Sequence, residues 1–552
     1  MPAGASETMF GALRNIFRLL RIARTLARHD ALFPFENAGI APGLIALVRL
    51  ISGRRPPALR AARPGQRLAA ALQRLGPSFI KAGQTLATRA DLVGEEVATD
   101  LSALQDQLPP FPAAQARATI EAEFGRPLAE LFEEFDDEPV AAASIAQVHF
   151  ARTRTPVRVA PVLPGVVPEA DSDNDEDNDE GEGVRAVAVK VLRPGIVEAF
   201  ARDLDLFYWI ARMIERTRPD LRRLKPVEVI DIFAESVAVE MDLRLEAAAA
   251  SELAQNFAGD PSFRVPAVDW ERTSRRVLTT ARIDGIRIDR RDALIAAGHD
   301  PDEILANAAA AFFNQAFRDG FFHADQHPGN IFVAADGALE VVDFGIMGRL
   351  DRKTRTYLAD MLLGFLNRDY RRVAEVHFEA GYVPMHKSLD AFTQAARSIG
   401  EPILGRPLNE ISIGRLLGQL FQVTEAFEME TQPQLLLLQK TMVVTEGVGR
   451  MLNPDLNIWA LARPLIEEWM RATRGPEARI RESASEISEA LERLPRLLRD
   501  VGRTVDTLSA GGLRLHPDTV RTLKAEEGRA NPLIWPLWAA VALLALGLLV
   551  VL

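Results

Sequence analysis

The spacing of apolar positions divides the chain into a mixed middle part and largely helical ends. Apolar residues recur at helical intervals in residues 10–30, and we predict one long helix over residues 227–254. Apolar or alternating runs at residues 186–191, 276–280 and 339–342 predict strands. After Asp351 the pattern is almost wholly helical. These elements together predict an α+β fold.

The last twenty residues, 533–552, contain no charged side chain. An apolar run of about 20 residues matches one crossing of the hydrocarbon core of a bilayer. Tryptophans stand at its start, where interfacial aromatic residues belong, and Arg521, Lys524 and Arg529 precede it. We therefore expect a single C-terminal span in the cytoplasmic membrane, with the main body on the cytoplasmic side.

Two further helical segments each have two possible uses. Arginines recur at helical spacing in residues 10–30, so this helix either lies on anionic lipid or packs on its own protein. In residues 480–508 apolar side chains step by threes and fours, which is typical of a coiled-coil seam. Pro495 and Gly502 interrupt that seam, so we expect packing on the body and leave a homodimer open.

Charge and cysteine content exclude several classes of function. The formal charge of −11 owes nine units to the acidic residues of 168–183, and the rest of the chain carries only −2. We expect a solvated, disordered insertion at 165–184 and no nucleic-acid partner. The chain has no cysteine, which excludes disulfides, thiolate zinc sites and cysteine nucleophiles.

The residues that carry chemistry begin with the segment from His323 to Asn330. Asp325 precedes Asn330 by five positions, and Asp343 opens an Asp-Phe-Gly sequence after a mostly apolar strand. Phosphoryl transfer from MgATP needs this set: one carboxylate to orient or deprotonate the acceptor, and an asparagine and a second carboxylate to hold Mg²⁺. A rival interpretation is a transition-metal site formed by His323, Asp325 and His327.

Lys190 lies inside an apolar strand and therefore needs a buried partner of opposite charge. A strand lysine that pairs with a helix glutamate and with ATP phosphates is part of the kinase site. Glu240, Asp242 and Glu246 are the candidate partners on the predicted helix 227–254. At ~100° per residue, Glu240 and Glu246 point in different directions, so one helix would serve two lysines.

Three more motifs resemble those of the UbiB/ADCK family of atypical kinases. Lys81-Ala82-Gly83-Gln84 resembles the KxGQ motif of that family, and Glu240-Met241-Asp242 resembles its ExD motif. The third motif resembles the family's alanine-rich nucleotide loop and consists of Val140, Ala141, Ala142, Ala143, Ser144, Ile145, Ala146, Gln147 and Val148. With the kinase motifs, the resemblance covers roughly residues 17–451.

The resemblance implies a two-lobed kinase-like fold with KxGQ helices over the active site. It pairs Lys81 with Glu240 and Lys190 with Glu246, and its cofactors are ATP and Mg²⁺. We divide the chain into an N-terminal helix and linker (1–60), KxGQ helices (61–115), an N-lobe (116–285), a C-lobe (286–455), a juxtamembrane region (456–530) and the span (533–552).

The implied function is a Mg²⁺-dependent ATPase or atypical kinase that supports ubiquinone biosynthesis. Its expected partners are membrane lipid, polyprenyl-phenol precursors and other enzymes of that pathway. Alanine restricts the close backbone approach that glycine allows around phosphates, which disfavours transfer to protein acceptors. Two alternatives stay open: a nucleotide-gated lipid-binding scaffold with little turnover, and a protein kinase with an unidentified acceptor.

Overall fold

The computed structural model describes residues 18–33, 62–87, 94–102, 104, 109–153, 185–217, 226–403, 419, 422–424, 426–429, 433–453 and 458–474. The chain divides into two compact units, Met1–Trp469 and Met470–Leu552, and the elements below belong to the first, except that the last helix continues to Arg474. The predicted acidic insertion, coiled-coil seam and C-terminal span lie outside the described residues. No helix among the described residues is long and apolar enough to cross a membrane.

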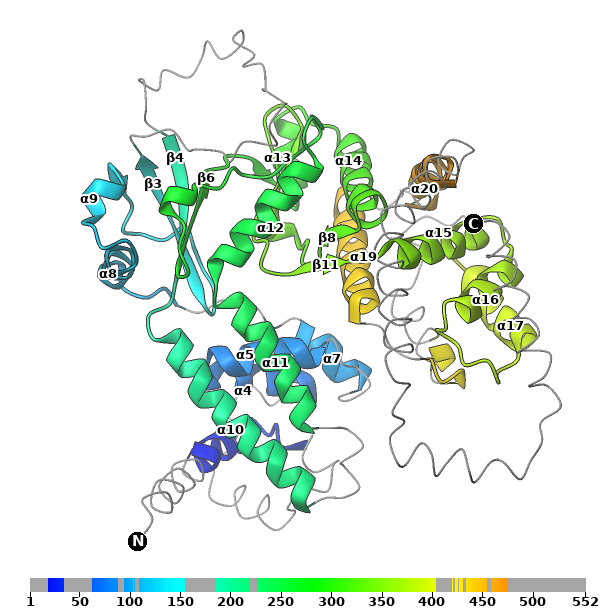
Figure 1. The fold of residues 1–552 in the computed structure, drawn as a ribbon, viewed down its shortest axis with the longest axis horizontal. Helices are drawn as coiled ribbons and strands as arrows, with labels where there is room; N and C mark the ends of the chain where they lie inside the picture. The colour runs from blue at the N-terminus through cyan, green and yellow to red at the C-terminus, as the bar shows by residue number, and fades with distance from the viewer. Residues whose placement is uncertain are drawn as a thin grey trace, which may run out of the picture. The chain divides into compact units, whose positions relative to one another are not determined.

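An antiparallel five-stranded sheet forms the first layer (Figure 1). Its strands follow the order β1 (Glu134–Phe135), β3 (Ala146–Thr153), β4 (Arg185–Leu192) and β6 (Val277–Ala281), and β2 (Ala141–Ala142) pairs with β3. β4 and β6 confirm two predicted strands. The helices α8 (Ala113–Phe124) and α9 (Leu128–Leu131) cover one face, where they pack on alternate valines of β4.

The predicted helix 227–254 is wrong in one respect, because the structure divides it in two. α10 (Ile196–Thr217) precedes α11 (Pro226–Glu240), and α12 (Leu243–Asn256) starts after a break. Asp242 has extended backbone angles at the break, and its carboxylate caps α12 by accepting a hydrogen bond from the backbone N–H of Arg244. Leu243 N–H donates to the carbonyl of Arg275 at 3.0 Å, so the neighbouring chain fixes the break.

The second layer contains the remaining strands and the helices beside them. β5 (Phe263–Arg264), β10 (Leu339–Val341), β9 (Ile331–Val333) and β7 (Ile286–Arg287) form one sheet, and β8 (Phe321–His323) pairs with β11 (Met347–Arg349). β10 confirms the third predicted strand. The helices of this layer are α13 (Arg291–Ala296), α14 (Pro301–Phe313), the π-helical turn η4 (Asn314–Asp319) and the short 3₁₀ turn η5 (Pro328–Asn330), whereas the 3₁₀ turn η3 (Trp270–Arg272) packs on β6 of the first sheet.

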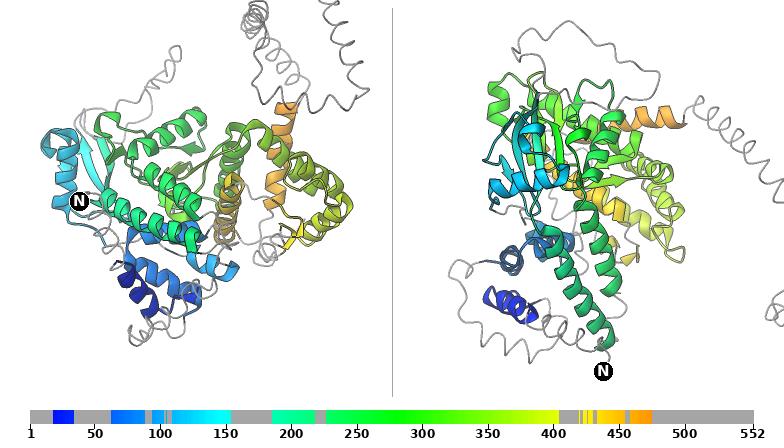
Figure 2. Two further views of the ribbon diagram at one scale, coloured as in Figure 1. Left: turned by 60° about the horizontal axis from the view of Figure 1, so that its bottom comes forward. Right: turned by 60° about the vertical axis from the view of Figure 1, so that its left-hand side comes forward.

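The N-terminal helices form a cluster of their own, α4 (Pro64–Leu75), α5 (Pro77–Ala87) and α7 (Glu95–Ser102) (Figure 2). Residues 18–28 are helical as well, and Ile22 and Leu26 pack with Leu68 and Leu72 of α4. Arg18 forms an ion pair with Asp203 of α10. Packing on the protein is thus confirmed for the described part of the basic helix.

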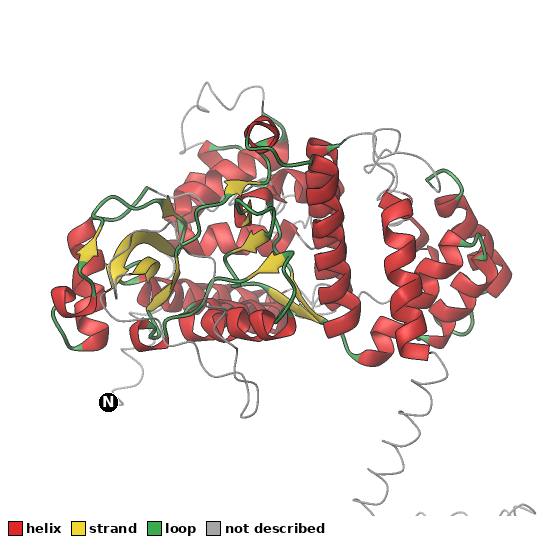
Figure 3. Cartoon of the chain, turned by 90° about the horizontal axis from the view of Figure 1, so that it is seen from above, coloured by secondary structure: helices red, strands yellow, loops and turns green. Residues whose placement is uncertain are grey.

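Helices dominate the described chain after Asp351, as the pattern predicts (Figure 3). They are α15 (Arg352–Leu366), α16 (Tyr370–Glu379), α17 (Leu389–Gly400), α19 (Pro433–Leu452) and α20 (Ile458–Arg474). α19 packs against α14, and its Val448 and Leu452 belong to the main hydrophobic core. This core holds the catalytic segments between β8 and β11 in place.

Candidate active site

Lys190 is the centre of the candidate active site. It lies on β4, in register with Val148 of β3 and Leu278 of β6, on the face opposite the α8 helix. Its ammonium group donates to both carboxylate oxygens of Glu246 on α12, at 2.7 and 2.9 Å. This ion pair confirms the predicted contact and supplies the partner that a buried lysine needs.

Asp343 is the second partner of the same ammonium group. The Lys190 Nζ lies 2.7 Å from Asp343 Oδ1, and the Asp343 side chain is 49% exposed, against 8% for Glu246. The backbone of Asp343 has a φ of +66°, a value that residues other than glycine rarely adopt. This backbone conformation turns the carboxylate of the Asp-Phe-Gly segment toward the lysine and leaves it accessible.

Two carboxylates around one ammonium group shift the ionisation of all three. Burial disfavours the charged form of Lys190, but the charges of Asp343 and Glu246 outweigh it and raise the pKa of the lysine. The Lys190 charge lowers the pKa of Asp343 despite partial burial. Burial raises the pKa of Glu246 from 4.5 to about 7, since the favourable effect of Lys190 is offset in part by the neighbouring charge of Asp343.

Hydrogen bonds within the loop hold the segment from His323 to Asn330 in shape. The buried ring of His323 accepts from the backbone N–H of Asp325 at Nδ1 (3.1 Å), so Nε2 carries the proton and donates to the carbonyl of Val342 (3.2 Å). Asn330 Nδ2 donates to the carbonyl of Asp325 at 3.1 Å. Burial lowers the pKa of His323, which keeps its ring neutral.

These hydrogen bonds contradict the rival transition-metal site. Both ring nitrogens of His323 are occupied by backbone partners, and His327 Nδ1 accepts from the N–H of Gly329 at 3.0 Å. A metal ligand needs a free nitrogen lone pair, which His323 does not offer. Among the described residues no group of three His, Asp, Glu or Cys side chains is placed to bind a metal.

The side chains of Asn330 and Asp343 suit Mg²⁺ when ATP supplies the remaining ligands. Both offer oxygen donors, and Mg²⁺ is commonly held by one or two carboxylates together with substrate phosphates. The Asn330 amide uses its nitrogen for the carbonyl of Asp325, so its oxygen remains for a cation. The donor set therefore fits the cofactors MgATP.

The alanine-rich segment forms a hairpin whose turn lies between β2 and β3. Ala143 N–H donates to the carbonyl of Ala146 at 2.8 Å, and Ala141 pairs with Val148. The buried hydroxyl of Ser144 has no hydrogen-bond partner within the described residues. Val148 is the member of this segment that pairs with Lys190 across the strands. The hairpin thus occupies the position of a kinase phosphate loop.

Gln147 uses its side chain for another purpose. It accepts from the backbone N–H of Phe111 at 2.9 Å and donates to the Phe111 carbonyl at 3.2 Å, on the face of β3 opposite Lys190. Only its backbone can therefore approach a nucleotide. Arg193 also connects the hairpin to the segment that contains Pro109 and Phe111. Its guanidinium donates to the carbonyls of Pro109 (3.0 Å) and Ala143 (3.4 Å).

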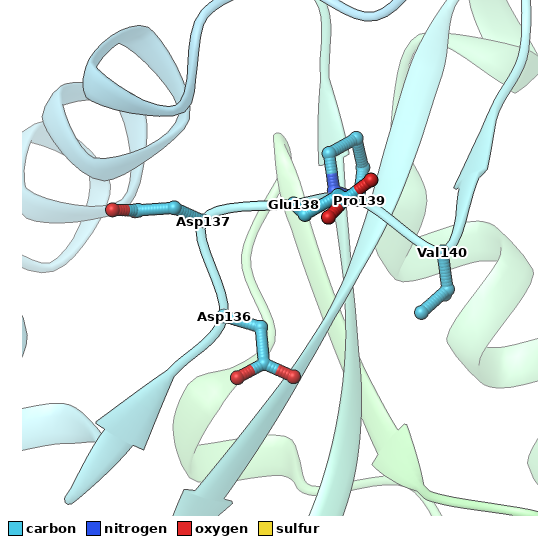
Figure 4. A pocket seen from close by; sticks show the side chains of 5 residues that line it. All are labelled: Asp136, Asp137, Glu138, Pro139 and Val140. Atoms are coloured by element: carbon cyan, nitrogen blue, oxygen red, sulfur yellow. The ribbon is translucent and has the colours of Figure 1, made fainter.

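A pocket of about 540 Å³ lies beside the hairpin (Figure 4). Its lining is acidic and consists of Asp136, Asp137, Glu138, Pro139 and Val140. Val140 is 51% exposed, and Figure 4 shows its side chain among those that line the pocket. An acidic lining repels phosphate, so this pocket is unsuited to the phosphate groups of a nucleotide.

The KxGQ motif lies on α5 and contacts α11. Lys81 Nζ lies 2.9 Å from Glu240 Oε2, with both side chains largely buried, which confirms the predicted contact. The charge of Lys81 also contributes to the lowered pKa of Asp343, so α5 acts on the active site electrostatically. Gln84 Nε2 donates to the carbonyl of Leu104 at 3.4 Å.

Gly83 of the KxGQ motif and Asp242 of the ExD motif have structural roles. A Cβ atom on Gly83 would lie 2.6 Å from a methyl group of Leu104 and 2.7 Å from one of Leu72, so glycine lets α5 pack tightly on its neighbours. Asp242 binds Arg244 at 2.6 and 2.9 Å as it caps α12, and this hydrogen bonding lowers its pKa. It does not share a helix face with Glu246.

Sequence reasoning missed Phe111, Arg193 and Gln315, which hold the site segments through backbone contacts. Gln315 lies in η4, and its side-chain oxygen accepts from the backbone N–H of His323 at 2.9 Å. A contact from a side chain to a backbone group leaves no residue pattern, so none of the three had a signal in the sequence.

Comparisons with known proteins indicate the family of the chain. The ABC1 atypical kinase-like domain matches residues 103–174 and 179–377, and the UbiB helical domain matches residues 396–457. A Mycobacterium tuberculosis protein solved in complex with erythromycin is similar over 72% of this chain and 95% of its own, with 25% identity and a TM-score of 0.48.

Two curated relatives extend the match to most of the chain. The probable protein kinase UbiB of Marinobacter nauticus is 43% identical over 78% of this chain and 75% of its own length. The probable protein kinase UbiB of Pseudomonas putida is 38% identical over 96% of this chain and 98% of its own. With its mixed α+β kinase-like fold, the chain belongs to the UbiB family of atypical, ABC1-type kinase-like proteins.

Proposed function

We propose that this protein is a Mg²⁺-dependent ATPase or atypical kinase that supports ubiquinone biosynthesis at the membrane. The observation that carries the proposal is the shared ammonium group of Lys190, held at 2.7 Å by both Glu246 and Asp343. Glu246 orients the lysine toward the alanine-rich hairpin, while the exposed Asp343 lies where a metal-phosphate complex would reach it. A scaffold protein without catalytic activity would not need the additional carboxylate of Asp325.

Each residue of the site has a distinct part in this proposal. Lys190 would bind the α- and β-phosphates, and Asp343 would hold the metal ion in place of its contact with Lys190. Asn330 provides a second ligand, and Asp325 orients or deprotonates the acceptor hydroxyl or water. Bound Mg²⁺ would supply the positive charge that stabilises the developing negative charge on the phosphates. The backbone of residues 140–148 cradles the nucleotide.

The acceptor in this proposal is small. The positive charge of Lys81 is one of the influences that lower the pKa of the Asp343 carboxyl group, after the larger effect of Lys190. In an ordinary protein kinase this side of the site admits a peptide. A helix held there by the buried Lys81–Glu240 pair favours water or a phenolic hydroxyl over a protein side chain.

The membrane part of the proposal combines two features of the chain. Arg21, Arg24 and Arg28 are exposed on the helix at residues 18–28, opposite its buried apolar side chains, and basic side chains attract anionic lipid. The apolar residues 533–552 would anchor the chain in the cytoplasmic membrane. Such a protein would extract polyprenyl-phenol intermediates or present them to other enzymes of the pathway.

Phosphate release from MgATP by the full chain in detergent tests the proposal. We expect turnover to rise when anionic vesicles and a phenolic quinone-precursor mimic are added. Asp325→Asn should abolish the increase while MgATP still binds. Clear MgATP binding without turnover in every condition would replace the ATPase with a nucleotide-gated scaffold, and efficient phosphorylation of a protein acceptor would establish a conventional kinase.

A further inference from the structure

The helix before the catalytic loop ends in an unusual turn. α14 continues into the π-helical turn η4 (Asn314–Asp319), which closes at Gly320 with a φ of +67°. A π-helical turn widens the helix by one residue, is less stable than an α-helical turn, and is frequently found at functional sites. The turn brings the side chain of Gln315, which is 0% exposed, against β8.

Gln315 holds the loop on both sides of Asp325. Its Oε1 accepts a hydrogen bond from the backbone N–H of His323 at 2.9 Å and another from Gln326 Nε2 at 3.3 Å. Since a backbone N–H can only donate, the orientation of the Gln315 amide is fixed. Its own Nε2 is buried and has no partner among the described residues.

An unsatisfied buried donor carries a free-energy cost that a purely structural residue would avoid. A leucine or methionine at position 315 would fill the same space without the unsatisfied Nε2, but it would leave the buried N–H of His323 without its acceptor. What only an oxygen acceptor supplies here is the restraint on His323 and Gln326. His323 in turn binds the N–H of Asp325 and the carbonyl next to Asp343, so the restraint reaches both carboxylates.

We propose that Gln315 is a positioning residue, whose side-chain oxygen holds the backbone N–H of His323 and the side-chain amide of Gln326, on either side of Asp325, and so keeps Asp325 in the orientation needed for phosphoryl transfer. The proposal rests on the proposed function, since it assigns Gln315 to the same reaction. Gln315 acts through the loop and does not touch the nucleotide, so its loss affects kcat and leaves MgATP binding intact.

The test compares wild type with Gln315→Met, which keeps the side-chain length but removes the acceptor, and with Gln315→Glu, which keeps an oxygen there. For Gln315→Met we expect kcat to fall about tenfold or more with an unchanged Kd for MgATP, since a fixed loop geometry is lost. Gln315→Glu should recover most of kcat. If Gln315→Met does not fold, Gln326→Met removes only the 3.3 Å bond and should lower kcat about threefold.

Hydrogen exchange of the His323 amide in the full-length protein gives a readout that needs no turnover. Its donor bond goes to Gln315, so exchange in Gln315→Met should be about tenfold faster, the effect of one lost hydrogen bond. Unchanged exchange, or unchanged kcat in an active wild type, would overturn the inference. A wild type that binds MgATP without turnover refutes the proposed function, and the exchange rate then still decides whether Gln315 holds the loop.

Discussion

Replacing Glu246 with glutamine removes a carboxyl group that is buried beside a lysine and a second carboxylate. The simple expectation is that losing half of a buried ion pair destabilises the protein. The structure predicts a different result, because Lys190 keeps Asp343 at 2.7 Å and because burial raises the pKa of Glu246 to about 7. We therefore expect the effect of Glu246→Gln on stability to depend on pH.

The sign follows from proton binding by the folded and unfolded states. The pKa of Glu246 is raised above its ordinary 4.5, so the stability contributed by its protonated form is complete below pH 4.5 and is lost as pH rises through about 7. The difference between a pKa of 4.5 and one of about 7 corresponds to about 3 kcal/mol of stability. Glutamine does not titrate, so Glu246→Gln should gain up to this amount over wild type between pH 4.5 and 8.

Urea unfolding in EDTA and without nucleotide, at pH 5, 6, 7 and 8, measures this difference. Comparing the two proteins at each pH cancels the titration of the buried histidines, which acts in the opposite direction. Asp343→Asn serves as the second arm: removing its charge lowers the pKa of Glu246, so the pH-dependent difference should shrink. If Glu246→Gln instead becomes less stable than wild type as pH rises, the electrostatic account of the site is refuted.

Three further changes test the KxGQ helices and the hairpin. Lys81→Ala leaves Glu240 largely buried without its ammonium partner, so it should destabilise the protein by about 2–4 kcal/mol, and Glu240→Gln in the same chain should recover part of the loss in urea unfolding. Gly83→Ala forces two leucine methyl groups apart and should cost about 1–3 kcal/mol in the same assay; a neutral result would show that α5 packs loosely. Arg193→Ala removes the hydrogen bond to the Ala143 carbonyl and should weaken MgATP binding about three- to tenfold by calorimetry, with Arg193→Lys intermediate. Equal binding by wild type and Arg193→Ala would show that this hydrogen bond does not support the nucleotide site.

The motifs and the contacts between them were predictable from sequence. Lys190 on an apolar strand needs a carboxylate, and the order of the kinase motifs limits the choice to one short segment. Both predicted ion pairs, Lys190 with Glu246 and Lys81 with Glu240, are present. The need for a partner follows from the cost of a buried unpaired charge, whereas the particular pairing was implied by the resemblance to the UbiB/ADCK family.

The local geometry between these residues was less predictable. Residues 227–254 have a continuous helical pattern, yet the chain breaks at Asp242, where a hydrogen bond from Leu243 to Arg275 competes with the helical one. The competing acceptor, the carbonyl of Arg275, lies far from Leu243 in the sequence, so the local pattern does not reveal it. The capping preference of aspartate was the one available signal. The break assigns Glu240 and Glu246 to separate helices, so the ion pairs were correct and the helix geometry used to explain them was wrong.

Contacts from side chains to backbone groups were beyond sequence reasoning. Gln147 and Phe111 exchange two hydrogen bonds, and Gln315 reaches His323 from a π-helical turn. An alternating strand pattern shows which face a residue occupies only once the buried face is known. In β3 buried side chains alternate with partly exposed ones, and Gln147 lies on the buried face. Gln147 therefore looked like part of the nucleotide loop although its side chain serves the opposite face.

The central claim is that Asp343 exchanges its contact with Lys190 for a metal ion in order to catalyse phosphoryl transfer. Phosphate release by the full-length protein and by Asp343→Asn, across a Mg²⁺ titration at saturating ATP, tests it most directly. We predict Mg²⁺-dependent turnover in wild type and a loss of at least about a hundredfold in Asp343→Asn, with ATP still bound through Lys190. Equal turnover in the two proteins, or turnover that does not depend on Mg²⁺, would contradict the claim.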